Sequence, residues 1–431
     1  MKQKYDLRGK RLLFIGASGH VGAAIQQANE LGVETIAINY SPRAFGKRFA
    51  SISEEVDTYE PEEVLEYAKK MNVDGVFTGW NEVNIFTAEY VANKLGFPFY
   101  GTKEQADQLV TKDAFKETCK KYNVPVVPEY FCGQDLTEDI IASFEYPVIF
   151  KPTDSGGTVG MTILNEKDDD EIHKAYTKAM DGSLKKTIIV EKYLRDTQLI
   201  VIDFAVQNGI PYIVSVADRI TVREKEERVP LGFCFMYPSE HLQMVNEQVL
   251  RPLTSLIKGL GIANAIISFE GMISEGKLYI IETQFRYGGT HMDRFVRSES
   301  GMNLMQMSIE YALTGHFDSW NISEYANPAF HNMYSCINLQ IKPGLITSYS
   351  GIQEVRDMEG VDWFLQLKDV GDRAPDDGST ARNFAKIGIC GKTRGELYKL
   401  IDLVQHTIHV FDEQYNDMVI CNVPQELLSG S

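Results

Sequence analysis

Apolar and polar residues along the first hundred positions follow the order of strands and helices in alternation. An apolar run at 11–15 leads into a glycine turn, a helical pattern and a second apolar run at 35–39. Another short apolar run spans 73–78, and a helical pattern covers 85–95. Because strands joined through helices pair in parallel, residues 1–105 are predicted to form an open parallel α/β domain.

The pattern changes after this region. A helical stretch at 111–122 is followed by the segment 124–128, whose two prolines end the helical periodicity. Helical periodicity returns at 302–313 and 394–411. Between these helices, strands follow strands with few crossover helices, which predicts an antiparallel sheet. The expected strands are 147–151, 160–164, 187–191, 199–206, 211–216, 265–273 and 277–282.

Charge and cysteine usage narrow the class of protein. The chain of 431 residues carries 43 Lys and Arg against 60 Asp and Glu, a formal charge of −17. The negative electrostatic field of this charge repels nucleic acid, so an anion can be bound only by a local cluster of hydrogen-bond donors and cations. The six cysteines form no C-x-x-C pair, and no stretch of about 18 apolar residues occurs. We therefore expect reduced, buried thiols, no membrane partner and a cytoplasmic location. His406 and His409 are expected to share a helix face without further metal ligands.

The first glycine turn, Gly16-x-x-Gly19-x-x-Gly22, follows a predicted strand. Such a turn can hold the pyrophosphate of a dinucleotide at a helix N-terminus. However, Asn39-Tyr40-Ser41 stands where an acidic residue would bind the ribose. Close packing of a helix on a strand is therefore the favoured interpretation, with a substrate-facing loop and a nicotinamide cofactor site as alternatives.

A second glycine-rich loop is more specific. Lys151 ends a predicted strand, the loop follows, and the next strand begins at Met161. Its amides can donate to phosphate oxygens while lysines place positive charge beside them, although no Gly-Lys-Ser/Thr follows as in a P-loop. The candidate phosphate-binding residues are Lys112, Lys151, Gly156, Gly157, Thr158 and Gly160. A strand then runs into a hinge, Glu191-Lys192-Tyr193-Leu194, where backbone groups of Glu191 and Leu194 could read an adenine edge.

Two carboxylates flank a predicted hairpin turn at Gly276. Glu270 and Glu282 are equally distant from the turn, so they can face each other across adjacent strands. Two inward-facing carboxylates need cations, and Mg²⁺ suits them because phosphates can complete its shell, whereas solvent-facing strand charges are the alternative. Arg286, just beyond the second strand, is suited to bind a carboxylate or a transferring phosphate.

As an ordered set, these motifs resemble the ATP-grasp superfamily, within it the biotin carboxylase and carbamoyl-phosphate synthetase-like branch. The resemblance covers roughly residues 8–320. It implies a mixed α/β and α+β architecture, an ATP-grasp fold preceded by a Rossmann-like (pre-ATP-grasp) domain that holds substrate rather than NAD. The implied domains are 1–105 (Rossmann-like), 106–190 (linker helix and lid with the glycine loop), 191–320 (ATP-grasp core with the metal-binding hairpin) and 321–431 (C-terminal cap).

The resemblance also implies roles for individual residues. Lys112 and Lys151 match lysines that contact phosphate, and Met272 matches an apolar residue packed on the purine. Arg286 matches the arginine that stabilises the acyl-phosphate step, and is thus the catalytic candidate. The matching metal ligands are Glu270, Glu282 and Gln284. The implied cofactors are ATP and Mg²⁺, two ions for which Mn²⁺ could substitute.

The chain departs from the family pattern at three places. Gln284 stands where the third metal ligand is usually Asn. No clear ribose ligand occurs near Gln198 or Leu199, with Asp203 close by. Thr290 replaces a glutamate of biotin carboxylases, so Arg286-Tyr-Gly-Gly resembles the amino-acid ligases of the superfamily more closely.

The function implied by the resemblance is ATP-dependent, ADP-forming joining of a small carboxylate to an amine through an acyl phosphate. The alternatives are a bicarbonate-activating carbamoyl-phosphate synthetase or carboxylase, an NAD(P)-binding oxidoreductase or epimerase, and a non-catalytic ATP-binding regulator. His291 could help to deprotonate the amine, although a structural role is favoured. The segment 218–237 is expected to form a mobile loop near the acceptor. Arg373, Arg382 and Lys386 are interpreted as solvated surface charge, with contact to an acidic substrate group as the alternative. A homodimer is compatible with the resemblance.

Overall fold

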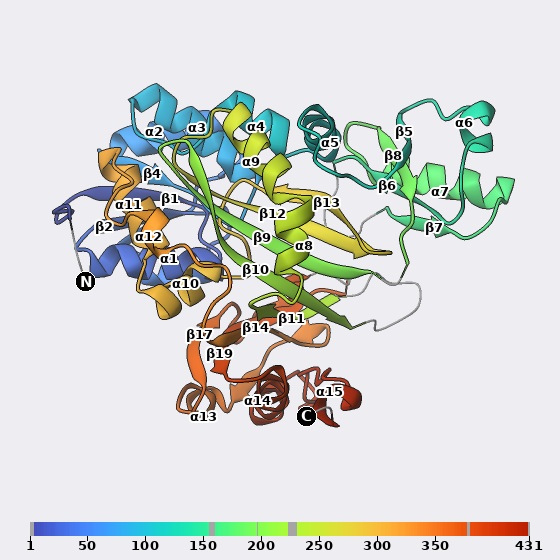
Figure 1. Ribbon diagram of the computed structural model, residues 1–431. Coiled ribbons are helices and arrows are strands. Elements are labelled where there is room, and N and C mark those ends of the chain that lie inside the picture. Colours follow the sequence, from blue (N-terminus) through green and yellow to red (C-terminus); the bar gives the residue numbers. More distant parts are fainter. Residues whose placement is uncertain (1–3, 155–159, 196, 223–230, 377–379, 430–431) are drawn as a thin grey trace.

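The computed structural model describes residues 4–154, 160–195, 197–222, 231–376 and 380–429 (Figure 1). Three sheets organise the chain: a parallel sheet near the N-terminus, a small antiparallel sheet at the opposite end in Figure 1, and a large antiparallel sheet between them and the C-terminal helices.

The N-terminal sheet has the order β3-β2-β1-β4, and all of its pairs are parallel. The open parallel α/β arrangement predicted for this part of the chain is thus confirmed. Burial explains it, because both central strands are apolar and almost completely enclosed. The elements are β1 (Arg11–Ile15), α1 (Gly19–Glu30), β2 (Glu34–Ile38), a 3₁₀ turn (Phe45–Phe49), β3 (Ile52–Glu54), α2 (Pro61–Lys70), β4 (Gly75–Phe77) and α3 (Val83–Leu95).

The first glycine turn packs against the protein itself. Gly16 has a φ of +98°, and a β-carbon on it would stand 2.6 Å from the Asn84 amide nitrogen. A β-carbon on Gly19 would stand 2.8 Å from the Leu367 backbone, and one on Gly22 would meet the Phe49 ring at the same distance. These close approaches support helix and strand packing as the reason for the glycines.

A linker of two helices leads to the small sheet, which has the order β5-β8-β6-β7 and is antiparallel throughout. We call this sheet and its helices the lid. A capping box formed by Thr102 and Gln105 begins the first linker helix. The elements are α4 (Lys103–Leu109), α5 (Lys112–Lys121), β5 (Glu129–Gly133), α6 (Glu138–Ala142), β6 (Val148–Pro152), β7 (Thr162–Leu164), α7 (Asp169–Asp181) and β8 (Ile188–Lys192).

The large sheet has eight strands in the order β13-β12-β9-β10-β11-β14-β19-β17, and every pair is antiparallel, as the strand spacing predicted. It continues without a break from the region 191–320 into 321–431. Its strands are β9 (Gln198–Gln207), β10 (Ile210–Val222), β11 (Leu231–Tyr237), β12 (Ala265–Ser274), β13 (Lys277–Gln284), β14 (Met333–Gln340), β17 (Val361–Gln366) and β19 (Asn383–Gly391). Its helices are α8 (Leu242–Gln248), α9 (Leu250–Gly259), α10 (Met292–Ser300), α11 (Leu304–Thr314) and α12 (Ile322–Tyr325).

The remaining elements cover the C-terminal end of this sheet. They are β15 (Gly344–Leu345), β16 (Ser348–Ser350), α13 (Ile352–Arg356), β18 (Arg373–Ala374), a 3₁₀ turn (Thr380–Arg382), α14 (Arg394–Thr407), β20 (His409–Phe411) and α15 (Gln425–Ser429). The helix predicted to reach residue 411 ends at Thr407, because the chain turns there to pair with β16. His406 and His409 therefore do not share a helix face, and the His409 Nδ1 lies 2.7 Å from an Asp417 carboxylate oxygen instead.

The predicted loop at 218–237 is also corrected in its described part. Residues 218–222 continue β10 and residues 231–237 form β11, so both ends belong to the large sheet. The side chain of Asp218 is buried, where it accepts hydrogen bonds from Ser239 and Arg394. Residues 223–230 lie outside the described part.

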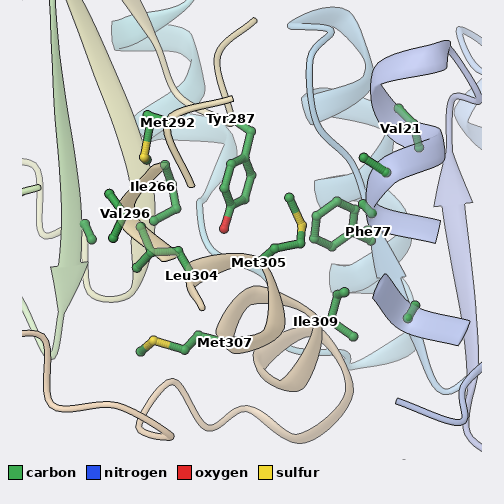
Figure 2. Close-up of a cluster of buried hydrophobic side chains, with 14 of the residues drawn as sticks. Val21, Phe77, Ile266, Tyr287, Met292, Val296, Leu304, Met305, Met307 and Ile309 are labelled. Atoms are coloured by element: carbon green, nitrogen blue, oxygen red, sulfur yellow. The ribbon is translucent and has the colours of Figure 1, made fainter. Parts of the chain in front are cut away.

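An apolar cluster joins the N-terminal domain to the large sheet (Figure 2). Met305 of α11 lies between Tyr287 and Phe77 of β4 in Figure 2, and Val21 of α1 lies beyond. Each such side chain contributes roughly 1.5–3 kcal/mol on full burial, so the junction is held by packing as well as by polar contacts.

None of the helices in the described part is long and apolar enough to cross a membrane. The cysteines are all unpaired, but Cys132 and Cys421 are exposed, so the expectation of buried thiols is wrong for these two.

Candidate nucleotide and metal site

The hairpin of β12 and β13 carries two facing carboxylates. Its turn uses Glu275 and Gly276, both at positive φ, which gives the type of turn whose twist matches paired strands. In the register of the two strands Glu270 lies directly opposite Glu282, as predicted, with a bulge beside the pair. Gln284 donates from Nε2 to Glu270 Oε1 at 3.1 Å. The three candidate metal ligands therefore lie together.

Glu282 is electrostatically unusual. Its side chain reaches solvent, but protein atoms displace much of the water around its carboxylate. This desolvation, followed by the negative charge of Glu270, raises the pKa of Glu282 to about 7, against the opposing effects of Lys112 and Arg286. A cation between the carboxylates would relieve that repulsion, so the residues present fit Mg²⁺.

Arg219 of β10 is a site residue that the sequence reasoning did not find. Its Nη1 lies 3.0 Å from Glu270 Oε2, so both Glu270 oxygens have partners while Glu282 remains the carboxylate available to a cation. Among the described residues, no group of three or more His, Cys, Asp and Glu side chains could hold a metal alone. Phosphate oxygens would have to complete the coordination shell.

Lys112 begins α5 and interacts electrostatically with the hairpin carboxylate Glu282. Burial lowers its pKa, while the charges of Glu282 and Glu191 raise it and Lys151 lowers it. The electrostatic neighbours of this lysine thus come from both the hairpin and the lid. The structure therefore brings the two candidate phosphate-binding lysines close to the candidate metal ligand Glu282.

Glu191 of β8 lies at the centre of a buried ion-pair network. Its two carboxylate oxygens each accept a hydrogen bond, one from Lys116 and one from Lys151. Burial raises the pKa of Glu191, but the two lysines outweigh it and the net shift is downward. Lys116 also lies 3.2 Å from Glu129, and its side chain is only 6% exposed. No sequence motif singled out Lys116, although it lies one helical turn after Lys112 on α5.

The glycine loop is described only at its end. Gly156, Gly157 and Thr158 lie outside the described residues. Gly160 has a φ of +75°, and a β-carbon there would stand 2.6 Å from the Pro152 ring. Both the backbone conformation and the contact require glycine at this position.

The hinge after β8 uses part of its backbone internally. The N–H of Lys192 donates to the Pro128 carbonyl at 2.9 Å, and that of Tyr193 donates to Pro147 at 2.8 Å. These two N–H groups are thus hydrogen-bonded within the protein. The adenine contact through backbone groups of Glu191 and Leu194 stays a prediction. Met272 is half-buried on β12, two residues after Glu270.

Arg286 joins the N-terminal domain to the large sheet. It pairs through Nη2 with Glu82, which precedes α3, and donates from Nη1 to the Tyr287 carbonyl at 2.7 Å. Its Nε is buried without a hydrogen-bond partner in the described part of the chain. The predicted catalytic arginine thus stands at the domain junction with one donor still available.

Two predictions about charged residues are wrong. Arg382 and Lys386 are buried, 3% and 5% exposed, and are not solvated surface charges, whereas Arg373 is exposed. The Lys386 ammonium lies 3.7 Å from where a β-carbon would stand on Gly289, and 5.5 Å from the centre of the Phe235 ring. Lys386 therefore places a second cation beside the glycine pair that follows Arg286.

Asp203, the nearest candidate for a ribose ligand, is fully buried inside the sheet. Its carboxylate accepts hydrogen bonds from Ser215 and Ser268, both at 2.6 Å, and burial raises its pKa to about 6. Asp203 is therefore part of the core, and its position does not favour a role as a ribose ligand.

His291 pairs with His20 of the first glycine turn. The His20 Nδ1 and His291 Nε2 atoms are 2.8 Å apart, and the Trp80 ring stacks on His20 and lies tilted against His291. Burial lowers the pKa of His20 to about 3 and also lowers the pKa of His291, so both are neutral. This pair was not foreseen, because the partners are far apart in sequence.

The fold, with its lid over a large antiparallel sheet, is that of the ATP-grasp class. Residues 111–312, just under half of the chain, match the family model described as carbamoyl-phosphate synthase L chain, ATP binding domain. The chain is thus similar to the carbamoyl-phosphate synthase-like branch of the ATP-grasp superfamily.

Individual relatives agree with this assignment. The chain is 28% identical over 294 residues to the carbamoyl phosphate synthase large chain of Clostridium perfringens, covering 65% of this chain and 26% of that protein. It thus spans about a quarter of that relative's length. It is 24% identical to the L-arginine-specific L-amino acid ligase of Bacillus subtilis, covering 76% and 78% of the two chains. The fold matches phosphoribosylglycinamide synthetase from Anaerococcus prevotii with a TM-score of 0.73 and 20% identity, over 94% of this chain and all of that one.

Proposed function

We propose that the protein is an ATP-dependent, ADP-forming ligase that joins a small carboxylate to an amine. The observation that carries this proposal is the facing pair Glu270 and Glu282, with Lys112 and Arg286 among the charges that act on Glu282. A pair of crowded carboxylates near half-buried lysines suits a nucleotide that brings its own cations.

The proposed cofactors are ATP and Mg²⁺, with two ions held by Glu270, Glu282 and Gln284 and with Mn²⁺ as a substitute. Bound there, the ions would offset the charge of the phosphates. Lys112, Lys151 and the 156–160 loop would hold the phosphates, and Glu191, Leu194 and Met272 the adenine. Glu191 contributes indirectly as well, since its carboxylate fixes the Lys151 ammonium.

The proposed reaction has two steps. A substrate carboxylate oxygen attacks the γ-phosphorus of ATP, the bond to the β-phosphate oxygen breaks, and ADP leaves. The amine then attacks the acyl carbon, phosphate leaves, and the amine loses a proton. Arg286 and Lys386, which lies beside Gly289, would stabilise the charge that develops on the reacting groups.

Amino acids are the proposed class of substrate, in keeping with the name of the Bacillus subtilis relative. The proposed partners are thus a small carboxylate and a small amine, with no nucleic acid or membrane, in a cytoplasmic protein that could form a homodimer. Bicarbonate activation, as in a carbamoyl-phosphate synthetase, is the second candidate because of the family match. Thr290 disfavours it, since a threonine cannot deprotonate bicarbonate as a carboxylate can.

The test is an ADP-release screen that crosses carboxylates, mainly amino acids, with amines, followed by mass analysis of products. We expect ADP and a condensed product from at least one pair, and a phosphorylated acid trapped by hydroxylamine when the amine is omitted. ADP released with bicarbonate alone would favour the second candidate. Binding of MgATP without ADP release for any pair would contradict the ligase and support a regulator.

The pKa of Glu282 gives a pH prediction. Because a metal ligand must be deprotonated, MgATP affinity should rise by about tenfold per pH unit up to about pH 7 and level off above it. Calorimetric titration between about pH 5.5 and 8.5 measures this slope. The Glu282→Gln variant serves as the control, because any pH dependence of its MgATP affinity comes from the nucleotide and not from residue 282. If the affinity changes with pH equally in both proteins, ionisation of Glu282 does not control binding.

A further inference from the structure

A cavity lined in part by Trp80 and His291 lies between the N-terminal domain and the large sheet. Its volume is about 400 Å³, and its walls come from α1, α10 and β17. Figure 1 shows α1 and α10 next to each other, with β17 close by. The volume falls in the range of sites for small molecules, roughly 300–1,000 Å³. None of the residues proposed to bind ATP or Mg²⁺ lines it.

The walls carry both signs of charge. Arg294 and Arg297 lie three residues apart on α10, so they share one face of that helix. The carboxylates come from three different elements, with Glu30 on α1, Asp293 on α10 and Asp362 on β17. Two guanidinium groups suit a carboxylate, and the carboxylates suit an ammonium group.

Three polar atoms of the cavity residues are unpartnered within the described part of the chain. They are Asp293 Oδ1, His291 Nδ1 and Trp363 Nε1. All three side chains are buried, with exposures of 8%, 1% and 9% respectively. Because protein atoms enclose these three atoms, the charged groups of the walls are the ones that can hold a ligand in the cavity.

The cavity is also rigid. The Gln27 side chain on α1 accepts hydrogen bonds from Arg297 at 3.1 Å and from Asn303 at 2.9 Å, which ties α1 to the last turn of α10 and to the start of α11. The Arg294 guanidinium lies 5.0 Å from the centre of the Trp363 ring, which orients it. A preformed site loses less entropy when it binds a ligand.

We infer that this cavity is a second ligand site that takes an α-amino acid, with the carboxylate on Arg294 and Arg297 and the ammonium group on Asp293. A simple anion would leave Asp293 unsatisfied, and a simple amine would leave the two arginines unsatisfied. The indole rings of Trp80 and Trp363 would line the side chain.

Two cavity residues, Trp80 and His291, contact the glycine pair that follows Arg286. Trp80 lines the cavity and donates from Nε1 to the Gly288 carbonyl at 3.0 Å. A ligand that shifts the indole would therefore act on the glycine pair beside Arg286. The site goes beyond the proposed ligase activity and can be tested without ATP.

Intrinsic fluorescence is the direct readout, because two of the three tryptophans line the cavity. Each proteinogenic L-amino acid is titrated into the full-length protein without nucleotide. We expect at least one to give a saturable change. For that amino acid, the α-keto acid, which lacks the ammonium group, and the amide, which lacks the carboxylate, should each bind about tenfold more weakly or worse.

Variants locate the binding. Arg297→Gln and Asp293→Asn should each weaken amino-acid binding by about tenfold or more. Arg251→Gln, which changes an exposed arginine on α9, is the matched control and should bind as the unchanged chain does. Asn has the same shape as the buried Asp293 side chain, and Arg297 is exposed, so we expect both variants to fold. If one of them does not fold, the other still tests the site.

Several results would overturn the inference. One is the absence of any fluorescence change, and another is equal affinity in all three variants. A third is a dimer that Arg297→Gln dissociates while no amino acid binds, which would assign this face to a second copy. Because ADP release is measured separately, failure here would leave the proposed ligase activity standing, and the reverse also holds.

Discussion

Replacing Glu282 by glutamine is expected to lower ADP formation by at least about a hundredfold, because it removes the carboxylate available to a cation. The same change should stabilise the ligand-free protein at alkaline pH. In the folded chain the pKa of Glu282 is raised from 4.5 to about 7, so its ionised form destabilises the fold. That destabilisation begins above the unfolded value and is complete above about pH 7. Thermal unfolding should thus give a higher Tm for the variant at about pH 8 and equal values near pH 4.5.

The opposite signs of the two effects make this test sharp, since a variant that merely misfolds would lose both activity and stability. Glu275→Gln is the control, because Glu275 is an exposed carboxylate in the turn of the same hairpin. It should leave both ADP formation and the pH dependence of Tm unchanged. Normal turnover in Glu282→Gln would remove Glu282 from the metal site.

The hairpin shows what sequence can predict about this site. Its turn lies at Gly276, between two largely apolar strands. Counting residues outward from this glycine gives the pairing of the strands, and Glu270 and Glu282 do face each other. The parallel N-terminal sheet was predictable for a similar reason, because local periodicity identifies strands and helices, and their alternation gives the direction of pairing.

The partners of these residues were not predictable in the same way. Arg219 reaches Glu270 from β10, and Lys386 reaches Gly289 from β19, across contacts that only the assembled sheet creates. Lys386 was misjudged because lysines are rarely buried, and the strand that buries it was not identified. His20 and His291 illustrate the same limit, since neither residue has a motif that points to the other.

The domain junction links these observations. Arg286 pairs with Glu82, and Trp80, two residues earlier, donates to Gly288, so the segment before α3 contacts the glycine pair and the arginine together. The N-terminal domain therefore sets the position of the loop where the acyl phosphate is proposed to form. This gives a structural reason for the pairing of the two domains beyond substrate binding alone.

The second large effect is expected at Lys116, whose replacement by methionine should destabilise the lid by about 3–5 kcal/mol. The side chains of Lys116 and Glu191 are 6% and 9% exposed, so the change leaves a buried carboxylate with Lys151 as its remaining partner. MgATP binding should weaken too, because the excess negative charge repels phosphates and draws Lys151 away from them. Denaturant unfolding and nucleotide titration measure the two effects.

Lys120→Met is the matched control on the same helix. Lys120 pairs with Glu117 and Glu129, but its side chain is 44% exposed, so its loss should change stability by about 1 kcal/mol or less. Adding Glu191→Met to Lys116→Met should recover part of the lost stability, since the buried carboxylate that lost one of its two lysines is then gone and Lys151, which is partly exposed, can be solvated. If Lys116→Met unfolds like Lys120→Met, or if the double variant is no more stable than Lys116→Met, the network around Glu191 does not stabilise the lid.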